Sequence, residues 1–190
     1  MNIAFGITGS FCTHAEILKQ IETLVKKGHN IIPIVTPIVL KTDTRFGKAK
    51  EFIESLESIT SNKVVSCITQ AEPLGPKNIV DIMIIAPCTG NTLSKLANAI
   101  TDNAVLLTAK SLLRNNKPIV IGVSTNDALG QNAKNLATLL NSKNIYFVPM
   151  RQDDFGNKPK SIVAKWNMIE KTLNFALNYQ QIQPVFVNAD

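Results

Sequence analysis

Small polar residues follow apolar, strand-length runs at four places in this sequence. The run Ile82–Ala86 leads directly into PCTGNT at residues 87–92, and three other runs lead into the polar segments Gly9-Ser10, Thr36 and Ser124-Thr125-Asn126. Any one such segment is ordinary, because Ser, Thr and Asn are good helix N-caps. At one edge of a parallel sheet, where ligands bind, four of them predict a cleft of uncharged hydrogen-bonding groups. A phosphate with a polyhydroxyl tail and a ring, as in flavin mononucleotide (FMN), suits this cleft.

The loop after the first of these runs has the composition of an anion site. Residues 6–11 are GITGSF and precede a helix-like pattern, so backbone N–H groups and a helix dipole would favour a phosphate there. The spacing is not the G-x-G-x-x-G of dinucleotide-binding folds, and no acidic residue ends the second strand. This argues against a nicotinamide cofactor on this chain. A glycine turn with hydroxyl capping is the alternative interpretation of the loop.

Two residues of the 87–92 segment have specific chemical interpretations. Asn91 could orient a ring carbonyl or a substrate carboxylate through its carboxamide, and its alternative role is a helix N-cap. Cys88 could be a reactive thiol, because a helix N-terminus favours the thiolate, but a small packed residue is the favoured interpretation. Asn91 is therefore the better catalytic candidate of the two.

Charged and imidazole side chains in loops provide further candidates. Arg45 follows the second strand, and its guanidinium could hold a substrate carboxylate or form a surface ion pair with Asp43 or a nearby Glu. His14 lies beside the first loop, where an exposed imidazole could help to bind an anion or could equally have no role. The loop Arg151–Lys160 is interpreted as a mobile lid or a subunit contact. Of these, Arg45 joins Asn91 as a candidate catalytic residue.

The composition is that of a globular protein and disfavours several functions. Hydrophobic residues make up 45% and charged residues 18% of the chain, and no apolar run reaches the ~20 residues of a membrane span. The net charge of +6 comes from scattered Lys and Arg, with Lys95 and Lys110 expected as solvated helix charges, and aromatic residues are only 6%. Scattered charge with few aromatics disfavours a nucleic-acid surface. The three Cys and two His residues show no metal-ligand spacing, so no metal site is expected.

Apolar runs alternate with helix-period segments, which is the pattern of βαβ units. The predicted strands cover residues 3–7, 31–35, 64–68, 82–86, 119–123 and 145–148. Predicted helices cover residues 48–59, 92–99, 103–115 and 132–141, in addition to one that follows the first strand. Pro33 lacks a ladder donor and indicates that the second strand is at an edge or is irregular. The pattern predicts an α/β fold in one domain, residues 1–190, with a single doubly wound, Rossmann-like parallel sheet and helices on both faces.

Two helix boundaries can be predicted in detail. Thr13 and Glu16 have the spacing of a capping box, and Gly28 is placed to end the same helix. Apolar residues recur every three or four positions from Ile162 to Ala176, which predicts one buried helical stripe at the end of the chain.

Three segments in order resemble a known family. GITGS, APCTGNTLSKLANAITDN and GVSTNDALG are similar to the flavoprotein family that includes the homo-oligomeric cysteine decarboxylases and the flavin prenyltransferases. The resemblance implies that the chain binds FMN and forms a homo-oligomer with the flavin near a subunit interface. The flavin contacts that it implies are Gly9, Ser10, Phe11, Thr36, Thr89, Gly90, Asn91, Thr92, Ser124, Thr125 and Asn126.

Further blocks resemble one branch of that family, the B subunits of dipicolinate synthases. These blocks are TDTRFG, AEPLGPK, RNNKPIVIGVSTNDALG, KNIYFVP, QDD and KPKSIVAK. The resemblance implies a cytoplasmic protein of the bacterial mother cell that acts during spore formation. Its partner would be an A subunit that uses NADP, and the pair would oxidise a small dicarboxylate, hydroxy-tetrahydrodipicolinate, to dipicolinate. A non-redox structural partner of the A subunit is the alternative.

The sequence departs from both stand-alone enzyme branches of the family. Decarboxylases have a catalytic histidine after the second strand, whereas the histidines here are His14 and His29. Prenyltransferases need a basic residue that grips phosphate near the later flavin loop, where this chain has Ser124-Thr125-Asn126. A stand-alone FMN-dependent decarboxylase or prenyltransferase is therefore a further alternative, and not the preferred function.

Overall fold

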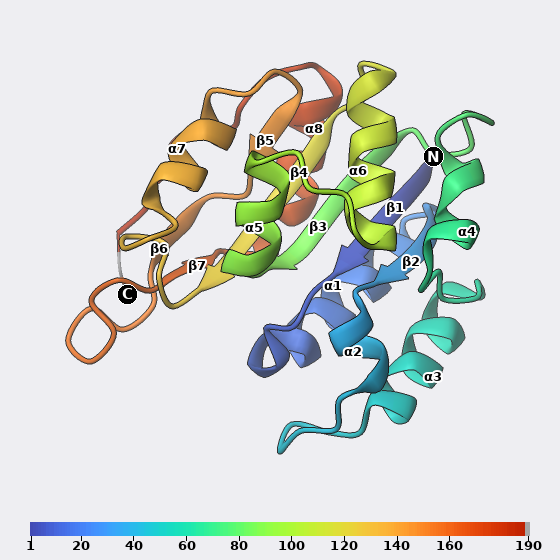
Figure 1. Ribbon diagram of the computed structural model, residues 1–190, viewed down its shortest axis with the longest axis horizontal. Helices are drawn as coiled ribbons and strands as arrows, with labels where there is room; N and C mark the ends of the chain where they lie inside the picture. Colours follow the sequence, from blue (N-terminus) through green and yellow to red (C-terminus); the bar gives the residue numbers. More distant parts are fainter. Residues whose placement is uncertain (189–190) are drawn as a thin grey trace.

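The computed structural model describes residues 1–188 and contains one seven-stranded sheet (Figure 1). Five strands are parallel, in the spatial order β2–β1–β3–β4–β5. Their bounds are β1 (Asn2–Ile7), β2 (Asn30–Val35), β3 (Ile82–Cys88), β4 (Ile119–Thr125) and β5 (Ile145–Phe147). The order reverses between β1 and β3, which is the switch point where open α/β sheets bind ligands. The predicted Rossmann-like fold is confirmed.

Helices cover both faces of the sheet, because successive residues of each strand point to opposite sides and both sets are largely apolar and buried. Ile3 and Phe5 belong to one core cluster and Ala4 to the other. The first cluster includes residues of α1 (His14–Lys26), α2 (Pro37–Lys41), α3 (Ala49–Thr60) and α8 (Ile169–Leu177). The second includes residues of α4 (Ile68–Ala71), α5 (Gly90–Ala97), α6 (Ala104–Arg114) and α7 (Ala133–Leu140).

An antiparallel hairpin, absent from the predicted strands, extends the sheet. It consists of β6 (Met150–Gln152) and β7 (Ile162–Ala164), and β7 pairs with the last residues of β4, Ser124 with Val163. Strand β4 runs beyond its pairing with β5, so its end has an unpaired edge that β7 fills.

The prediction of one helix from Ile162 to Ala176 is therefore wrong at its start. Ile162 and Ala164 are buried on either side of a half-buried Val163, which is the two-residue alternation of a strand. A short 3-10 turn, Trp166–Met168, then leads into α8. The apolar spacing reflects helical structure only from Trp166 onwards. Ile162 falls on the same spacing by coincidence.

Two other local predictions are corrected. Of residues 64–68, Val65 pairs with Ile34 in an isolated bridge rather than in a full strand. The Thr13 hydroxyl donates to the Ser10 carbonyl (2.8 Å) and makes no capping bond to α1. Gly28, in contrast, adopts φ +82° just after α1, a left-handed conformation that ends a helix as predicted. Strand β2 lies at the sheet edge, consistent with its Pro33.

Candidate functional site

Hydrogen bonds join the carboxyl ends of β1, β3 and β4. The Thr8 hydroxyl donates to the Pro87 carbonyl (2.6 Å) and accepts from the backbone N–H of Thr89 (3.0 Å). The hydroxyls of Ser10 and Ser124 lie 2.8 Å apart. The parallel register therefore brings the predicted polar segments together at one edge. Thr8, whose two hydrogen bonds join the segment after β1 to the segment after β3, is not among the predicted site residues.

A cleft of about 540 Å³ opens at this edge between the end of β2 and the start of α5. We call it the Thr36 cleft. It contains the predicted residues Gly9, Thr36, Thr89, Asn91 and Thr92. Its remaining lining residues are Thr8, Pro37, Ile38, Lys95, Asp102 and Asn103.

Thr36 has an unusual environment within this cleft. The residue occupies the N-cap position of α2, where a threonine hydroxyl ordinarily accepts from a backbone N–H, but it makes no such bond. Thr36 is 6% exposed, and its hydroxyl has no hydrogen-bond partner among the described residues. A buried hydroxyl without a partner is costly. The Thr36 hydroxyl is therefore available to a polar group that enters the cleft.

Lys95 and Asp102 form an ion pair inside the same cleft. The Lys95 ammonium lies 2.5 Å from the Asp102 carboxylate, and a hydrogen bond from Lys95 lowers the pKa of Asp102. The prediction of Lys95 as a solvated charge is wrong, since its side chain is only 26% exposed. Lys95 lies four residues after Asn91 on one face of α5, and that spacing could have located it.

A second cleft, of about 390 Å³, adjoins the first, and both are lined by Gly9 and Thr89. We call it the Lys158 cleft, after a cation contributed by the loop between β6 and β7. It contains the predicted residues Gly9, Ser10, Phe11, Thr89, Ser124, Thr125 and Asn126, together with Cys12, Thr13, Phe46, Asp153, Lys158, Ser161, Ile162 and Val163. The two clefts bring ten of the eleven predicted flavin contacts to one edge of the sheet.

Gly90 is the predicted contact that lines neither cleft. It lies behind the site, where an added Cβ would be 2.7 Å from atoms of Thr125, Asp127 and Asn132. The Asp127 carboxylate accepts from the Thr125 hydroxyl (2.6 Å) and from the Asn132 amide (2.7 Å). Glycine is thus needed for close packing of α5 against this polar network.

Asn91 lies within α5 and lines the Thr36 cleft. The N-cap of this helix is Thr89, so the alternative interpretation of Asn91 as the N-cap is wrong. The carboxamide is exposed at the cleft and has room to meet a ligand.

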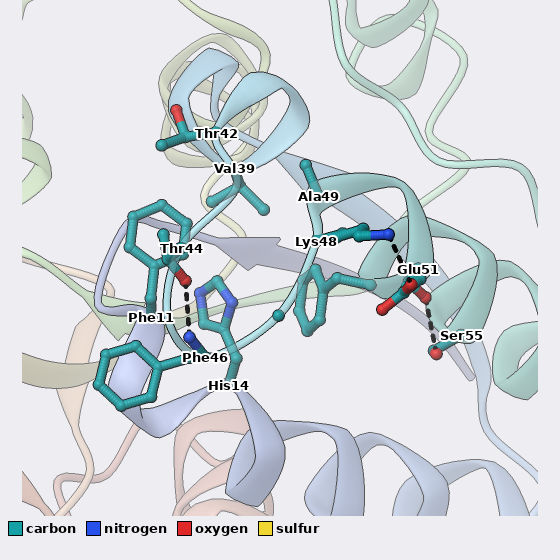
Figure 2. Close-up of a pocket in the computed structure, with 12 residues that line it drawn as sticks. Phe11, His14, Val39, Thr42, Thr44, Phe46, Lys48, Ala49, Glu51 and Ser55 are labelled. Atoms are coloured by element: carbon teal, nitrogen blue, oxygen red, sulfur yellow. Dashed lines mark hydrogen bonds and ion pairs between the residues drawn. The ribbon is translucent and has the colours of Figure 1, made fainter.

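His14 lies in a smaller pocket of about 160 Å³ beside the Lys158 cleft (Figure 2). The ring is buried and stacks on Phe52, with 4.4 Å between ring centroids. Its Nε2 lies 2.9 Å from the Thr8 carbonyl oxygen and must donate to it. Burial lowers the pKa of His14, partly opposed by this hydrogen bond. The expectation of an exposed imidazole that binds an anion is wrong.

Cys88 and Arg45 have different surroundings from those that a reactive site needs. Cys88 is fully buried, and burial raises its pKa to about 12, so it is the packed residue favoured from the sequence. Arg45 is exposed, and its guanidinium lies 4.9 Å from the centroid of the Phe46 ring. Phe46 lines the Lys158 cleft, but Arg45 lines neither cleft.

Membrane spans and metal clusters are both absent from residues 1–188. No helix there is long and apolar enough to cross a membrane. No group of three or more His, Cys, Asp or Glu side chains in that range could hold a metal ion.

Comparison with known proteins identifies the class of protein that has this fold and this site. A family model described as Flavoprotein matches residues 1–176. The chain belongs to the Flavoprotein family. Among solved structures, an FMN-dependent cysteine decarboxylase, SpaF, has a TM-score of 0.66 at 17% identity, and the match covers 94% of this chain and 97% of that one. At that identity the likeness shows the fold.

Much closer relatives belong to one branch of the family. The chain is 50% identical over 185 residues to the dipicolinate synthase B subunit of Bacillus subtilis (strain 168), and the match covers 97% of this chain and 92% of the relative. The crystal structure of the dipicolinate synthase B subunit from Bacillus halodurans has a TM-score of 0.90 and 49% identity, and the match covers 98% of this chain and 95% of that one. The predicted family resemblance is thereby confirmed.

Proposed function

We propose that this chain is the FMN-binding B subunit of a dipicolinate synthase. With a nicotinamide-dependent A subunit, it would take part in the oxidation of hydroxy-tetrahydrodipicolinate to dipicolinate in a spore-forming bacterium. The observation that carries the proposal is the buried Thr36 hydroxyl without a partner among the described residues, in a cleft that it shares with Gly9 and the Thr89–Thr92 segment. The identity to the Bacillus subtilis B subunit over nearly the whole chain supports the choice of branch.

The residues of the two clefts fit an FMN molecule. Thr36, Thr89 and Thr92 offer hydroxyls to a phosphate or ribityl chain, and Gly9 lets a ligand approach the backbone closely. Asn91 offers both a donor and an acceptor to the edge of a ring. The clefts meet at Gly9 and Thr89, so one elongated ligand can extend from one into the other.

In this proposal the chain binds and positions its ligands, and its residues contribute little acid–base catalysis. FMN, when bound, supplies a centre that can accept a hydride. Thr8 holds the β1 and β3 ends together by its two hydrogen bonds, so the polar groups keep one geometry as a ligand binds. Thr36, before α2, and Asn91, in α5, orient the ligand from two different elements of the Thr36 cleft.

One observation favours the alternative of a non-redox partner. The titratable groups that line the Thr36 cleft are Lys95 and Asp102, and they are paired with each other. His14 is buried and bonded to Thr8, and the pKa of Cys88 is about 12. Few of the groups that line the Thr36 cleft are therefore ready to transfer protons during an oxidation, and the A subunit could supply that chemistry.

A spectroscopic experiment tests the proposal. The visible absorption spectrum of the purified protein is recorded before and after FMN is added, and excess FMN is removed by gel filtration. We expect a flavin spectrum that stays with the protein. Free FMN that separates completely from the protein would contradict the proposal.

A reconstitution then distinguishes the redox role from the structural one. Flavin-stripped chain is mixed with the A subunit, and dipicolinate formation is measured with and without FMN. Dependence on FMN is expected from a redox role, whereas full output without FMN would leave only the structural partnership. Turnover of a cysteine-containing pantothenate or peptide substrate by this chain alone would instead favour a decarboxylase.

A further inference from the structure

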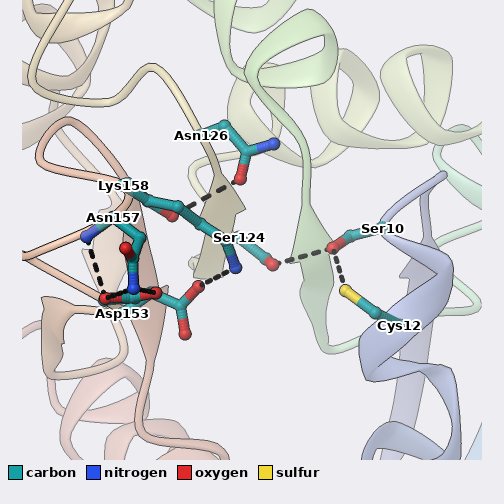
Figure 3. Close-up of polar contacts among 9 residues, drawn as sticks. Ser10, Cys12, Ser124, Asn126, Asp153, Asn157 and Lys158 are labelled. Carbon is teal, nitrogen blue, oxygen red and sulfur yellow. Dashed lines mark hydrogen bonds and ion pairs between the residues drawn. The ribbon is translucent and has the colours of Figure 1, made fainter.

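The Lys158 cleft contains a single cation among the described residues that line it. Its charged lining residues are Lys158 and Asp153, which come from the loop between β6 and β7. Figure 3 shows the Lys158 side chain reaching from this loop toward Ser124, on the opposite wall. A cation from a segment distant in the sequence thus lies in the same cleft as the 124–126 loop.

The ion pair of Lys158 can be exchanged at little cost. Its ammonium lies 3.2 Å from the Asp153 carboxylate, and the two side chains are 53% and 41% exposed. An exposed pair of this kind contributes little to stability, because water screens both charges. A ligand anion could therefore replace Asp153 as the partner of Lys158, and Asp153 would then be hydrated.

The loop that carries Lys158 is ordered by its own hydrogen bonds. The Asp154 carboxylate accepts from the backbone N–H of Asn157 (3.1 Å), and the N–H of Ser161 donates to the Lys158 carbonyl (2.9 Å). These bonds hold the Lys158 backbone, while its flexible four-carbon side chain remains adjustable.

Hydroxyl donors lie on the opposite wall. Ser10 and Ser124 are 2.8 Å apart, and either can donate to the other. If Ser10 donates, the Ser124 hydroxyl keeps its hydrogen for a further acceptor, whereas if Ser124 donates, the Ser10 hydrogen can go to a further acceptor or to the Cys12 Sγ 3.8 Å away. A carboxylate between this pair and Lys158 would accept a neutral and a charge-assisted hydrogen bond.

We propose that the Lys158 cleft binds a carboxylate of a small exchangeable ligand, held between Lys158 and the Ser10–Ser124 pair. Given the proposed function, on which the choice of ligand rests, that ligand is the dicarboxylate substrate or product. An exposed, exchangeable partner suits a ligand that enters and leaves at every turnover better than it suits a resident cofactor phosphate. In the same proposal the cofactor occupies the Thr36 cleft, where the buried Thr36 hydroxyl has no partner among the described residues.

Calorimetric titration of the purified full-length chain with dipicolinate (pyridine-2,6-dicarboxylate) tests the proposal, with the protein both FMN-free and FMN-loaded. We expect Lys158→Gln to weaken dipicolinate binding about tenfold or more, as for a lost hydrogen bond to a charged group. Asp153→Asn removes the competing carboxylate and is expected to leave binding equal or tighter. Lys143→Gln, an exposed lysine before β5 at the opposite edge of the sheet, is the matched control and should change nothing.

A parallel titration with FMN and riboflavin separates the two sources of an anion. The proposal predicts that Lys158→Gln leaves both affinities unchanged. Weaker FMN binding with unchanged riboflavin and dipicolinate binding would assign Lys158 to the cofactor phosphate and overturn the proposal. Absence of dipicolinate binding to either form of the wild type would also overturn it.

Failure of the proposed function would look different. If the chain binds no FMN but Lys158→Gln abolishes dipicolinate binding, the result supports the carboxylate site and contradicts the proposed flavin site. Circular dichroism of each variant checks that it is folded.

Discussion

The carboxyl ends of the parallel strands and the β6–β7 hairpin form opposite walls of one groove, but they are built differently. The strand ends are joined by hydrogen bonds between Thr8, Pro87 and Thr89 and lie over a core of fully buried residues. The hairpin loop contributes Asp153 and Lys158, both exposed. We call the strand ends the fixed wall, because hydrogen bonds hold them in one geometry. We call the hairpin loop the adjustable wall, because its exposed side chains can change position. This difference suggests that the fixed wall holds a resident ligand and the adjustable wall an exchanging one.

Thiol reactivity should give the largest contrast between the interior of the fixed wall and the groove surface. Burial raises the pKa of Cys88 to about 12, whereas Cys12 is exposed and lines the Lys158 cleft. Since only the thiolate reacts, a rise from 9 to 12 reduces the reactive fraction of Cys88 about 1,000-fold. Alkylation by iodoacetamide at pH 8, followed by peptide mass spectrometry, should label Cys12 and spare Cys88.

The same labelling in urea is the control for thiol reactivity, because unfolding should expose Cys88. Native labelling of Cys88 as fast as Cys12 would show that the fixed wall opens readily, and the contrast between the two walls would fail.

Matched glycine substitutions compare the packing of the two walls. An alanine Cβ at Gly90 would meet three polar atoms at 2.7 Å, whereas at Gly156, in the hairpin loop, the nearest atom is 3.8 Å away. Overpacking of this kind typically costs about 1–3 kcal/mol. We expect Gly90→Ala to lower the free energy of unfolding by about that amount, measured in urea, and to weaken FMN binding.

Gly156→Ala serves as the control, since its backbone is not left-handed and its surroundings are open. Its free energy of unfolding should stay within about 0.5 kcal/mol of the wild type. Equal effects of the two substitutions would mean that the network around Asp127 yields easily, and that Gly90 is not a packing requirement.

The same contrast explains which parts of the fold could be predicted from the sequence. Buried strands such as β3 and β4 are continuous apolar runs, and the residues after them necessarily share an edge in a parallel sheet. The polar segments at 9–11, 36, 89–92 and 124–126 could therefore be assembled without any three-dimensional information. Their role in flavin binding is still a prediction.

The hairpin could not be predicted in the same way. Strand β7 has three residues, too few for a periodic signal, and its apolar positions continued the spacing of α8. Its existence depends on the unpaired edge at the end of β4, which is a tertiary property. The sequence for that reason places Lys158 in a loop interpreted as a lid or a subunit contact. It does not identify Lys95 as a site residue, because the pairing of Lys95 with Asp102 crosses from α5 to the loop before α6.

Thr36→Val tests the fixed wall at its most distinctive atom. In the free protein, removal of a buried hydroxyl without a partner should raise the free energy of unfolding, by up to about 1 kcal/mol. If FMN binds to that hydroxyl, its affinity should fall about fivefold to tenfold, as for one net hydrogen bond. Urea denaturation and FMN fluorescence titration measure the two effects, and only a ligand role predicts that they have opposite signs.

Thr138→Val is the control for the threonine substitution, because Thr138 is exposed on α7 and lines neither cleft. It should leave FMN affinity unchanged. Stabilisation by Thr36→Val without any loss of FMN affinity would remove the main support for the cofactor site.

The pH dependence of stability should reveal a smaller contribution from His14, which links the fixed wall to α1. Burial lowers the pKa of His14, although its hydrogen bond to the Thr8 carbonyl opposes the shift. Below its ordinary pKa of about 6.5 the unfolded chain binds a proton that the folded chain resists, so stability falls as the pH falls through that value. Above that pH the imidazole is neutral in both the folded and the unfolded chain, so His14 adds nothing to the pH dependence of stability.

His14→Gln isolates that contribution, because glutamine can still donate to the Thr8 carbonyl but does not titrate. Urea denaturation at pH 7.5 and 5.5 should show a larger loss of stability in the wild type than in His14→Gln. His29→Gln is the comparison: burial also lowers the pKa of the partly buried His29, so this variant should retain the part of the wild-type pH dependence that comes from His14. Identical pH profiles for wild type and His14→Gln would mean that the ring is hydrated in solution, and that the small pocket beside the groove is more open than its packing against Phe52 implies.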